Sequence, residues 1–217
     1  MSSAELPDLS AIRTEYATVG LSDEAALDDP FELFSKWFAE VASVGLLEPN
    51  AMEVATIGPD GSPTSRMVLL KGIEQGTFHF YTNLESAKAR DLLADPRCAL
   101  LFPWYPLQRQ VRIVGSASLI PRAEVMEYYA KRPRAAQIGA WASHQSSPIY
   151  SRSALDQQYA ATEARFTDDE VPCPDFWGGF SVEADQIEFW HGRLNRLHDR
   201  IHYLRTPDGW RHERLQP

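Results

Sequence analysis

The residues best suited to chemistry gather in one basic segment, residues 193–203, with the sequence RLNRLHDRIHY. If this segment is a strand, alternate residues share a face, and one side carries Arg196, His198, Arg200 and His202. Such a row of cationic and titratable groups suits an anion or an electron-rich ring, although a solvated face of a half-buried sheet has the same pattern. A zinc site is disfavoured. His198 and His202 are four residues apart, as on a zinc-binding helix, whereas the segment has the pattern of a strand, and no acidic third ligand follows.

A second candidate is the pair Tyr128 and Arg132, four residues apart in a segment with helical character. Residues at this spacing lie on one helix face, so a phenol and a guanidinium could converge on a phosphate. A surface arginine packed along a tyrosine is the alternative. Pro133 follows directly, which places Arg132 at a helix end or a bend.

Three shorter groups could also bind a phosphate. Arg66 and Lys71 are five residues apart in a predicted strand, so they serve one ligand only if the strand bends or one of them lies at its end. Ser86 and Lys88 stand at the start of a predicted helix, where free N–H groups favour anions. Residues 145–147, Gln-Ser-Ser, form a polar loop of hydrogen-bond donors.

Strands predominate among the elements that must position these side chains. Alternating apolar residues and a Gly-Pro-Asp-Gly turn predict a hairpin from residues 51–57 and 65–71. The absence of βαβ alternation and of a GxGxxG motif excludes a Rossmann domain, so we expect an α+β protein built on an antiparallel sheet or barrel. Further strands are predicted at residues 77–82, 98–104, 108–118, 179–183, 186–190, 196–204 and 210–215. Helices are predicted at residues 9–16, 86–94, 121–132 and 154–166, and a further helix is predicted to start at Asp29-Pro30.

Bulk composition restricts the class of protein. A formal net charge of -9 and a pI near 5.1 disfavour DNA or RNA as a partner. Cys98 and Cys173 are far apart and form no CxxC pattern, so neither a disulfide framework nor a zinc ribbon is expected. Without a signal-like N-terminus or an apolar run of about 20 residues, no membrane association is expected and a cytoplasmic location is predicted.

Six segments carry a family resemblance that covers nearly the whole chain, from about Ile12 to Pro217. Their order and spacing resemble successive signatures of the pyridoxine/pyridoxamine 5'-phosphate oxidase family. The segments are RMVLLK at 66–71, FYTNLESAKA at 80–89, FPWYPLQRQV at 102–111, RPRAAQIGAWASHQSS at 132–147, FWGGF at 176–180 and EFWHGRLNRLHDR at 188–200.

The resemblance implies an antiparallel split β-barrel with surrounding helices that binds FMN between the two subunits of a homodimer. It implies an N-terminal arm over residues 1–28 and one FMN-binding domain over residues 29–217. The implied reaction oxidises pyridoxamine 5'-phosphate and pyridoxine 5'-phosphate to pyridoxal 5'-phosphate, with O2 as the electron acceptor and H2O2 as a product.

The resemblance also assigns roles to residues. Arg196 and His198 would act at the reacting carbon, and no metal is implied. The flavin would be held by Arg66, Met67, Val68, Leu69, Leu70, Lys71, Tyr81, Thr82, Lys88, Gln110, Gln145, Ser146, Trp190 and Arg200. The substrate would be held by Lys71, Tyr128, Arg132, Arg196, Leu197 and His198, with Arg13 and Tyr16 in an N-terminal segment that closes over the site.

Two positions depart from the family pattern. Many relatives have Arg where this chain has Ala87, and Ser where it has Ala136, which removes a charged contact and a hydroxyl. These changes affect ligand affinity more than the type of reaction. Two alternatives stay open: a split-barrel flavin oxidase for another aromatic substrate such as a phenazine precursor, and a non-enzymatic carrier of flavin or pyridoxal phosphate. Release of H2O2 on addition of pyridoxamine 5'-phosphate would separate all three.

Overall fold

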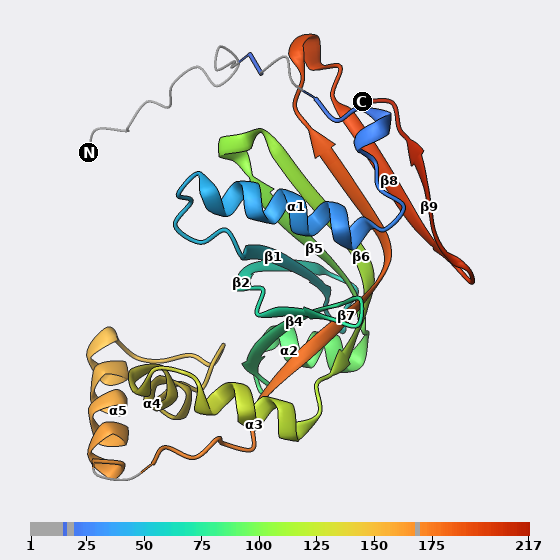
Figure 1. Cartoon of the computed structure of the whole chain (residues 1–217). Helices are drawn as coiled ribbons and strands as arrows, with labels where there is room; N and C mark the ends of the chain where they lie inside the picture. The colour runs from blue at the N-terminus through green and yellow to red at the C-terminus, as the bar shows by residue number, and fades with distance from the viewer. Residues whose placement is uncertain (1–14, 17–19, 168–169) are drawn as a thin grey trace. The chain divides into compact units, whose positions relative to one another are not determined.

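A computed structural model describes residues 15–16, 20–167 and 170–217 of the chain (Figure 1). The predicted helix over residues 9–16 and the predicted substrate residue Arg13 therefore lie outside the described residues, except for Glu15 and Tyr16. The helices are η2 (Asp23–Ala25), α1 (Pro30–Ser43), α2 (Ala87–Ala94), η3 (Tyr105–Leu107), α3 (Arg122–Ala130), α4 (Arg134–Ala142), α5 (Arg152–Arg165) and η4 (Leu194–Arg196). The strands are β1 (Ala51–Ile57), β2 (Pro63–Leu69), β3 (Gly72–Glu74), β4 (Thr77–Asn83), β5 (Arg97–Trp104), β6 (Arg109–Leu119), β7 (Trp177–His191), β8 (Asp199–Thr206) and β9 (Gly209–Arg214).

Backbone pairing joins the strands in the order β2-β1-β5-β6-β7-β4-β3, with β8 paired to β7 and β9 paired to β8. The chain divides into two compact units. The first unit comprises Met1–Leu46, Pro103–Val111 and Glu188–Pro217, and the second comprises Leu47–Phe102 and Arg112–Ile187. The predicted division into an arm of residues 1–28 and a domain of residues 29–217 stays a prediction.

The second unit contains the predicted hairpin of β1 and β2. The two strands pair antiparallel from Ala51 opposite Leu69 to Ile57 opposite Pro63. Gly61 closes the turn with a φ of +82°, a backbone conformation that glycine adopts without strain. β1 alternates between buried and half-buried residues, as expected of a strand with one face in a core. Because β2 ends at Leu69, Lys71 lies beyond the strand and is not bound to its alternation.

Strand β4 lies beside β7 in the same unit. Phe80 lies opposite Phe180, and their rings stack with centroids 5.7 Å apart. Both side chains are almost completely buried, as is Phe78. The structure contradicts the prediction of two separate strands at residues 179–183 and 186–190, because β7 runs without interruption from Trp177 to His191.

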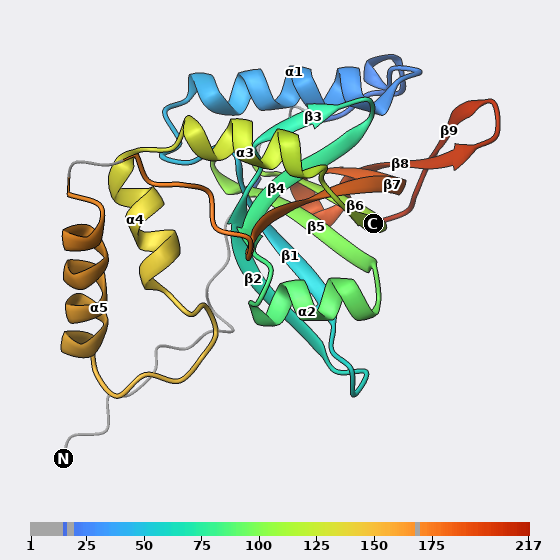
Figure 2. The same ribbon diagram turned by 90° about the horizontal axis from the view of Figure 1, so that it is seen from below.

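Helices α2 to α5 also belong to the second unit. α2 starts where the sequence predicted it, and Ser86 caps the helix: its Oγ accepts a hydrogen bond from the Ala89 N–H. α3 ends at Ala130, so Arg132 lies in the turn before α4 and not on the same helix as Tyr128. The sequence did not indicate α4, which is rich in alanine and starts after Pro133. α4 and α5 lie side by side in Figures 1 and 2.

The core of the first unit forms around α1. Asp29 caps this helix by accepting a hydrogen bond from Phe31 N–H, and Pro30 occupies its first turn, as predicted. The buried face includes Trp37, whose ring meets Phe189 edge-on at 5.2 Å. None of the described helices is long and apolar enough to cross a membrane.

The basic segment of residues 193–203 is not one continuous strand, which corrects the sequence-based prediction. Asn195 and Arg196 have φ values of 56° and 60°, and two successive left-handed residues are incompatible with a strand. β8 begins only at Asp199, so Arg196, at the end of the short helix η4, and His198, in the loop after it, both precede the strand. Arg200 and His202 do alternate in β8 with the buried Ile201 and Tyr203.

Candidate functional site

A buried lysine organises the most cationic part of the second unit. Lys88, only 8% exposed, donates hydrogen bonds from Nζ to Gln145 Oε1 at 2.9 Å and to Thr82 Oγ1 at 3.1 Å. These acceptors are neutral oxygens, so they satisfy the donors of the ammonium without cancelling its charge. We call Arg66, Thr82, Lys88, Gln145 and Ser146 the Lys88 cluster.

The second cation of the Lys88 cluster is Arg66. Its guanidinium donates to Thr56 Oγ1 at 2.7 Å and to Thr64 Oγ1 at 2.6 Å, and Nη2 lies 3.7 Å from Asp91 Oδ2. Burial lowers the pKa of Lys88, and the positive charge of Arg66 lowers it further. Arg66 pairs with one carboxylate, and Lys88 donates to neutral oxygens, so the two cations leave positive charge that an anionic ligand would compensate.

The start of α2 adds backbone donors to this cluster. Ala87 N–H donates to Ser146 Oγ at 3.2 Å, which ties the loop after α4 to the first turn of α2. Ser146 adopts a φ of 70°, so the loop turns sharply at this residue. A helix N-terminus beside two cations is a suitable environment for a phosphate.

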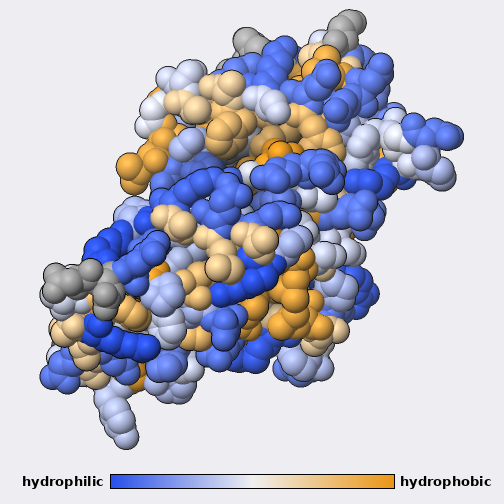
Figure 3. All heavy atoms as spheres, turned by 60° about the horizontal axis from the view of Figure 1, so that its bottom comes forward, coloured by the Kyte–Doolittle hydropathy of each residue, from blue (hydrophilic) through white to orange (hydrophobic). Residues whose placement is uncertain are grey.

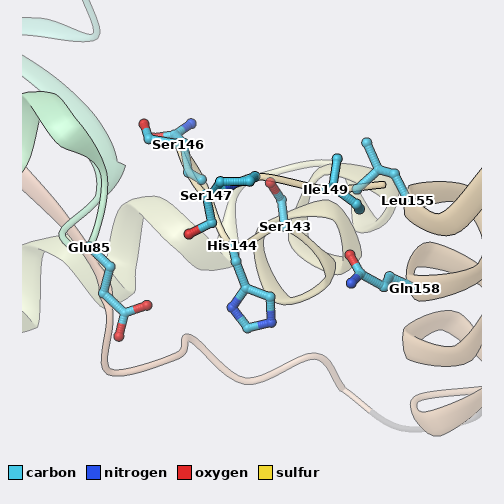
Figure 4. A pocket seen from close by; sticks show the side chains of 10 residues that line it. Glu85, Ser143, His144, Ser146, Ser147, Ile149, Leu155 and Gln158 are labelled. Carbon is cyan, nitrogen blue, oxygen red and sulfur yellow. The ribbon is translucent and has the colours of Figure 1, made fainter. Parts of the chain in front are cut away.

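The same loop lines a pocket of about 380 Å³. Figure 4 shows Ser146, Ser147 and His144 on the loop, with Glu85 across the pocket and Gln158 on α5. The flavin residues predicted in this loop are therefore next to an open space as well as next to Lys88.

Arg132 lies in a second pocket of the same unit. Its guanidinium stacks 4.3 Å above the ring of Trp177 and donates to the Ala136 carbonyl at 3.0 Å. Arg132 Nε and Trp177 Nε1 are buried and have no hydrogen-bond partner among the described residues. The pocket measures about 290 Å³ and is lined by Asn83, Arg132, Ala136, Gly139, Ala140, Ser143, Gln145 and Trp177. Arg132 and Gln145 thus line one cavity, although the sequence assigned them to different ligands.

The predicted substrate clamp of Lys71, Tyr128 and Arg132 is not assembled by direct contacts among the described residues. Tyr128 stacks on Tyr81 with ring centroids 3.7 Å apart and an interplanar angle of 5°. Burial raises the pKa of Tyr81, and the charge of Glu74 raises it further. Lys71 is exposed, and its backbone N–H donates to the His79 carbonyl at 2.8 Å.

The first unit holds a separate group, the His198 cluster, which consists of Tyr16, Trp190, Arg193 and His198. The rings of Trp190 and His198 lie 4.6 Å apart, and Tyr16 meets His198 edge-on at 5.5 Å. The backbone N–H of Arg193 donates to His198 Nδ1 at 3.1 Å. Burial lowers the pKa of His198, and Arg196 lowers it further. A neutral imidazole with Nδ1 as an acceptor carries its proton on Nε2, so His198 presents an N–H donor.

The remaining basic residues of this loop and strand have different surroundings. Arg200 forms a two-point ion pair with Glu188 at 2.9 and 3.0 Å, and Glu188 is buried. This arginine is therefore engaged within the protein.

Arg196 and Leu197 have exposed side chains, with Leu197 67% exposed. Gln110 is half-buried in β6.

The predicted flavin-side residues of β2, and Leu70 directly after the strand, differ in exposure. Met67 is 56% exposed, Val68 and Leu69 are half-buried, and Leu70 is buried at 7%. The strand offers an apolar edge at Met67 beside the cationic Arg66.

Several residues of these sites were missed by sequence reasoning. Thr56, Thr64 and Asp91 support Arg66, and Trp177 supports Arg132. The hairpin register could have identified the two threonines, because it places Thr56 opposite Thr64, two residues from Arg66. No local pattern connects Trp177 with Arg132, since 44 positions separate them in the sequence.

Comparisons with known proteins agree with the family resemblance. A family model described as "Pyridoxamine 5'-phosphate oxidase" matches residues 38–166, and one described as "Pyridoxine 5'-phosphate oxidase C-terminal dimerisation region" matches residues 177–217. A relative from Nocardioides sp. is 51% identical over 97% of this chain and 98% of its own length, and one from Rubrobacter xylanophilus is 50% identical over 97% of each. Both are named pyridoxine/pyridoxamine 5'-phosphate oxidase.

A solved structure has a similar fold. The crystal structure of PhzG from Burkholderia lata 383, in complex with tetrahydrophenazine-1-carboxylic acid, superposes with a TM-score of 0.86. It is 28% identical to this chain and covers 92% of it and 99% of its own length. The predicted α+β class, with an antiparallel sheet and surrounding helices, is confirmed.

Proposed function

The chain belongs to the pyridoxamine 5'-phosphate oxidase family, and from this premise we propose that it oxidises pyridoxamine and pyridoxine 5'-phosphates to pyridoxal 5'-phosphate. The observation that carries the proposal is identity of 44–51% over nearly the full length of relatives with this name. The substrate loses two electrons and two protons, and O2 becomes H2O2. The amine substrate also consumes water and releases ammonia.

The Lys88 cluster fits the phosphate end of FMN. It combines two cations, the first turn of α2 and a polar loop, and it holds a positive charge that neutral partners leave uncompensated. We assign Arg66, Lys88, Gln145 and Ser146 to this phosphate. FMN, when bound, supplies a two-electron acceptor that amino-acid side chains do not provide. The flavin roles of Tyr81, Gln110, Trp190 and Arg200 stay predictions.

We assign the substrate phosphate chiefly to Arg132. Its buried Nε lacks a partner among the described residues, and an unsatisfied buried donor costs about 1–3 kcal/mol. A phosphate oxygen would satisfy it. Trp177 and the Ala136 carbonyl already fix the guanidinium plane, so little side-chain entropy would be lost on binding. Lys71 and Tyr128 stay predicted partners of the same phosphate.

We assign Arg196 and His198 to the substrate ring near the reacting carbon. Because His198 Nδ1 accepts the Arg193 N–H, its Nε2–H would donate to an oxygen of the substrate and would not take up a proton. Arg196 would supply positive charge on the exposed side of the loop, which stabilises negative charge on the ring as the hydride leaves.

We propose a homodimer as the functional unit, supported by the match of residues 177–217 to a dimerisation region. Figure 3 shows apolar residues interspersed among hydrophilic ones on one face of the molecule. Exposed large apolar side chains include Met67 and Leu197, both in segments with predicted ligand roles. A cytoplasmic location stays a prediction.

A second candidate function is oxidation of a phenazine precursor, favoured by the similarity to the PhzG structure with its tricyclic ligand. That ligand is a carboxylic acid without a phosphate. Arg132 Nε, which has no partner in the part of the chain that the structure describes, and the family residues Lys71 and Tyr128 favour the phosphorylated substrate. The higher identity to the vitamin oxidases, 51% against 28%, points the same way.

The test is oxygen consumption with H2O2 release by the FMN-loaded protein. Pyridoxamine 5'-phosphate should be oxidised and tetrahydrophenazine-1-carboxylic acid should not. Turnover of the phenazine alone would replace the first proposal with the second. Binding of pyridoxal 5'-phosphate without turnover of either compound would identify a carrier.

A further inference from the structure

One carboxylate of the first unit accepts hydrogen bonds from three donors. Asp199 Oδ2 accepts from the Leu21 N–H at 3.0 Å and from Arg193 Nη1 at 3.2 Å, and Oδ1 accepts from Arg214 Nη1 at 2.7 Å. The side chain of Asp199 is only 17% exposed. This residue therefore joins the N-terminal segment, the loop before β8 and strand β9 at one point.

Arg214 makes the complementary contacts. Its Nη2 donates to the Leu21 carbonyl at 2.9 Å, and its Nε donates to Asp23 Oδ1 at 2.7 Å. Both backbone polar groups of Leu21 are thus bonded to the Asp199–Arg214 ion pair. Leu21 itself is buried at 3%. We call residues 20–23 the anchored segment.

Two glycines allow the backbone to approach closely enough for these contacts. A Cβ atom on Gly20 would lie 2.1 Å from Asp199 Oδ2 and 2.2 Å from Arg193 Nη1. A Cβ atom on Gly192 would lie 2.9 Å from the Tyr16 ring. The anchored segment packs directly on the ion pair, and Tyr16 packs directly on the backbone beside Trp190.

The two contact points lie close together in the sequence, both in the N-terminal segment and in the segment before β8. His198 meets Tyr16, and its neighbour Asp199 meets Leu21, five residues after Tyr16. We propose that Asp199 and Arg214 are positioning residues, which fix residues 20–23 and thereby hold Tyr16 against His198 and Trp190. The consequence for the substrate rests on the proposed function: the anchored segment holds Tyr16 where it supports substrate binding by His198.

The first measurement is hydrogen exchange of the Leu21 amide in the FMN-loaded protein. Asp199→Ala and Arg214→Ala should each accelerate its exchange at least about tenfold, because each variant removes a charged hydrogen-bond partner of Leu21 or the ion pair that orients it. Arg211→Ala is the matched control, since Arg211 lies on the same strand and forms an ion pair with the exposed Glu213. Unchanged exchange in both variants would overturn the anchoring.

The second measurement separates positioning from general stability. Asp199→Ala, Arg214→Ala and the uncharged change Gly20→Ala should raise KM for pyridoxamine 5'-phosphate about tenfold, with FMN affinity unchanged and kcat altered less than KM. Arg214→Lys should restore part of the loss, because it keeps one charged contact. Faster Leu21 exchange with unchanged KM would overturn the positioning role.

The two proposals fail in distinguishable ways. Absence of turnover in the wild type overturns the proposed oxidase function, whereas exchange at Leu21 needs no substrate and still tests the anchoring. Gly20→Ala guards against a folding defect in the charge variants, because it leaves every charge of the network in place. If Gly20→Ala leaves both the exchange of the Leu21 amide and the KM unchanged, the close packing of this segment has no positioning role.

Discussion

The Lys88 cluster and the His198 cluster are built on opposite principles. In the Lys88 cluster, a buried cation is held by side chains from a strand and a loop, beside a hydrogen-bonded arginine. In the His198 cluster, aromatic rings meet in edge-on and tilted arrangements beside a chain segment with two left-handed residues. The first is organised by charge before any ligand arrives, whereas the second depends on how the N-terminal segment packs.

This difference indicates which part of a ligand each region suits. A fixed cationic group recognises a phosphate through charge and changes little on binding. A loop with exposed Arg196 and Leu197 can adapt to a flat ring, and it leaves room for the reacting groups. If this difference holds, affinity for FMN and for the substrate phosphate comes from the charged pockets of the second unit, and acid lowers the stability of the region around the His198 cluster first.

The largest effect should come from removing the substrate phosphate. Pyridoxamine and pyridoxine should be oxidised with kcat/KM at least about 10³-fold below their phosphates, because an empty site leaves buried donors such as Arg132 Nε unpaired. Arg132→Lys should raise KM for the phosphates, since lysine lacks the planar fork of donors. Steady-state kinetics on both substrate pairs measures this, with the exposed Arg152→Lys as control. Equal kcat/KM for both pairs would remove the role of Arg132.

The next effect concerns Lys88. Lys88→Met should weaken FMN binding about 100-fold, equal to about 2.7 kcal/mol, because a buried charged donor to the phosphate is lost. The FMN-free protein should be no less stable, since the variant also removes the desolvation cost that lowers the Lys88 pKa. FMN titration and thermal unfolding test both halves, with the exposed Lys131→Met as control. Loss of stability together with unchanged FMN affinity would make Lys88 a structural residue.

Acid should weaken the region of the His198 cluster first. Burial, together with the nearby charge of Arg109, lowers the pKa of His191 to about 4. The unfolded state, with a pKa near 6.5, binds the proton earlier, so stability is lost as the pH falls from about 6.5 to 4. The shift sets an upper limit of about 3 kcal/mol, and solvent screening reduces the expected loss to about 2 kcal/mol.

Urea unfolding between pH 7 and pH 4 measures this loss. His191→Phe should show a flatter pH dependence than the wild type, because the ring that contacts Trp37 is kept while the titrating group is removed. Hydrogen exchange should then locate the acid-induced opening near Trp190 and not near Lys88. Identical pH profiles of variant and wild type would contradict this account.

The sequence predicted the regular elements better than the loops. The helix starts at Asp29 and Ser86 and the hairpin of β1 and β2 follow from local residue preferences, and all were confirmed. The loop around Arg196 was predicted as a strand because alternating polar and apolar residues also occur where the backbone turns left-handed. Local alternation does not report the φ of a single residue.

The candidate sites were predictable only in part for a similar reason. The family resemblance pointed to Lys88, Gln145 and Ser146, and in the structure Lys88 donates a hydrogen bond to Gln145, while Ser146 accepts one from Ala87, the residue before Lys88. It assigned no role to Trp177 or Asp91, whose contribution depends on packing between distant segments. The predicted helical pairing of Tyr128 with Arg132 was wrong because Pro133 ends α3 early.

The smallest predicted effect concerns Ala87, where many relatives have Arg. Ala87 opens α2, and its N–H donates to Ser146 Oγ, so position 87 is next to the proposed flavin phosphate site. Ala87→Arg adds a charged donor worth about 1.4 kcal/mol after screening by solvent, and FMN should bind about tenfold more tightly. Ala94→Arg places the same charge at the other end of α2 and should leave FMN affinity unchanged. Fluorescence titration with FMN compares the two. Equal tightening in both variants would mean that net charge attracts the anionic flavin, whereas no change in Ala87→Arg would mean that the Lys88 cluster already saturates the phosphate.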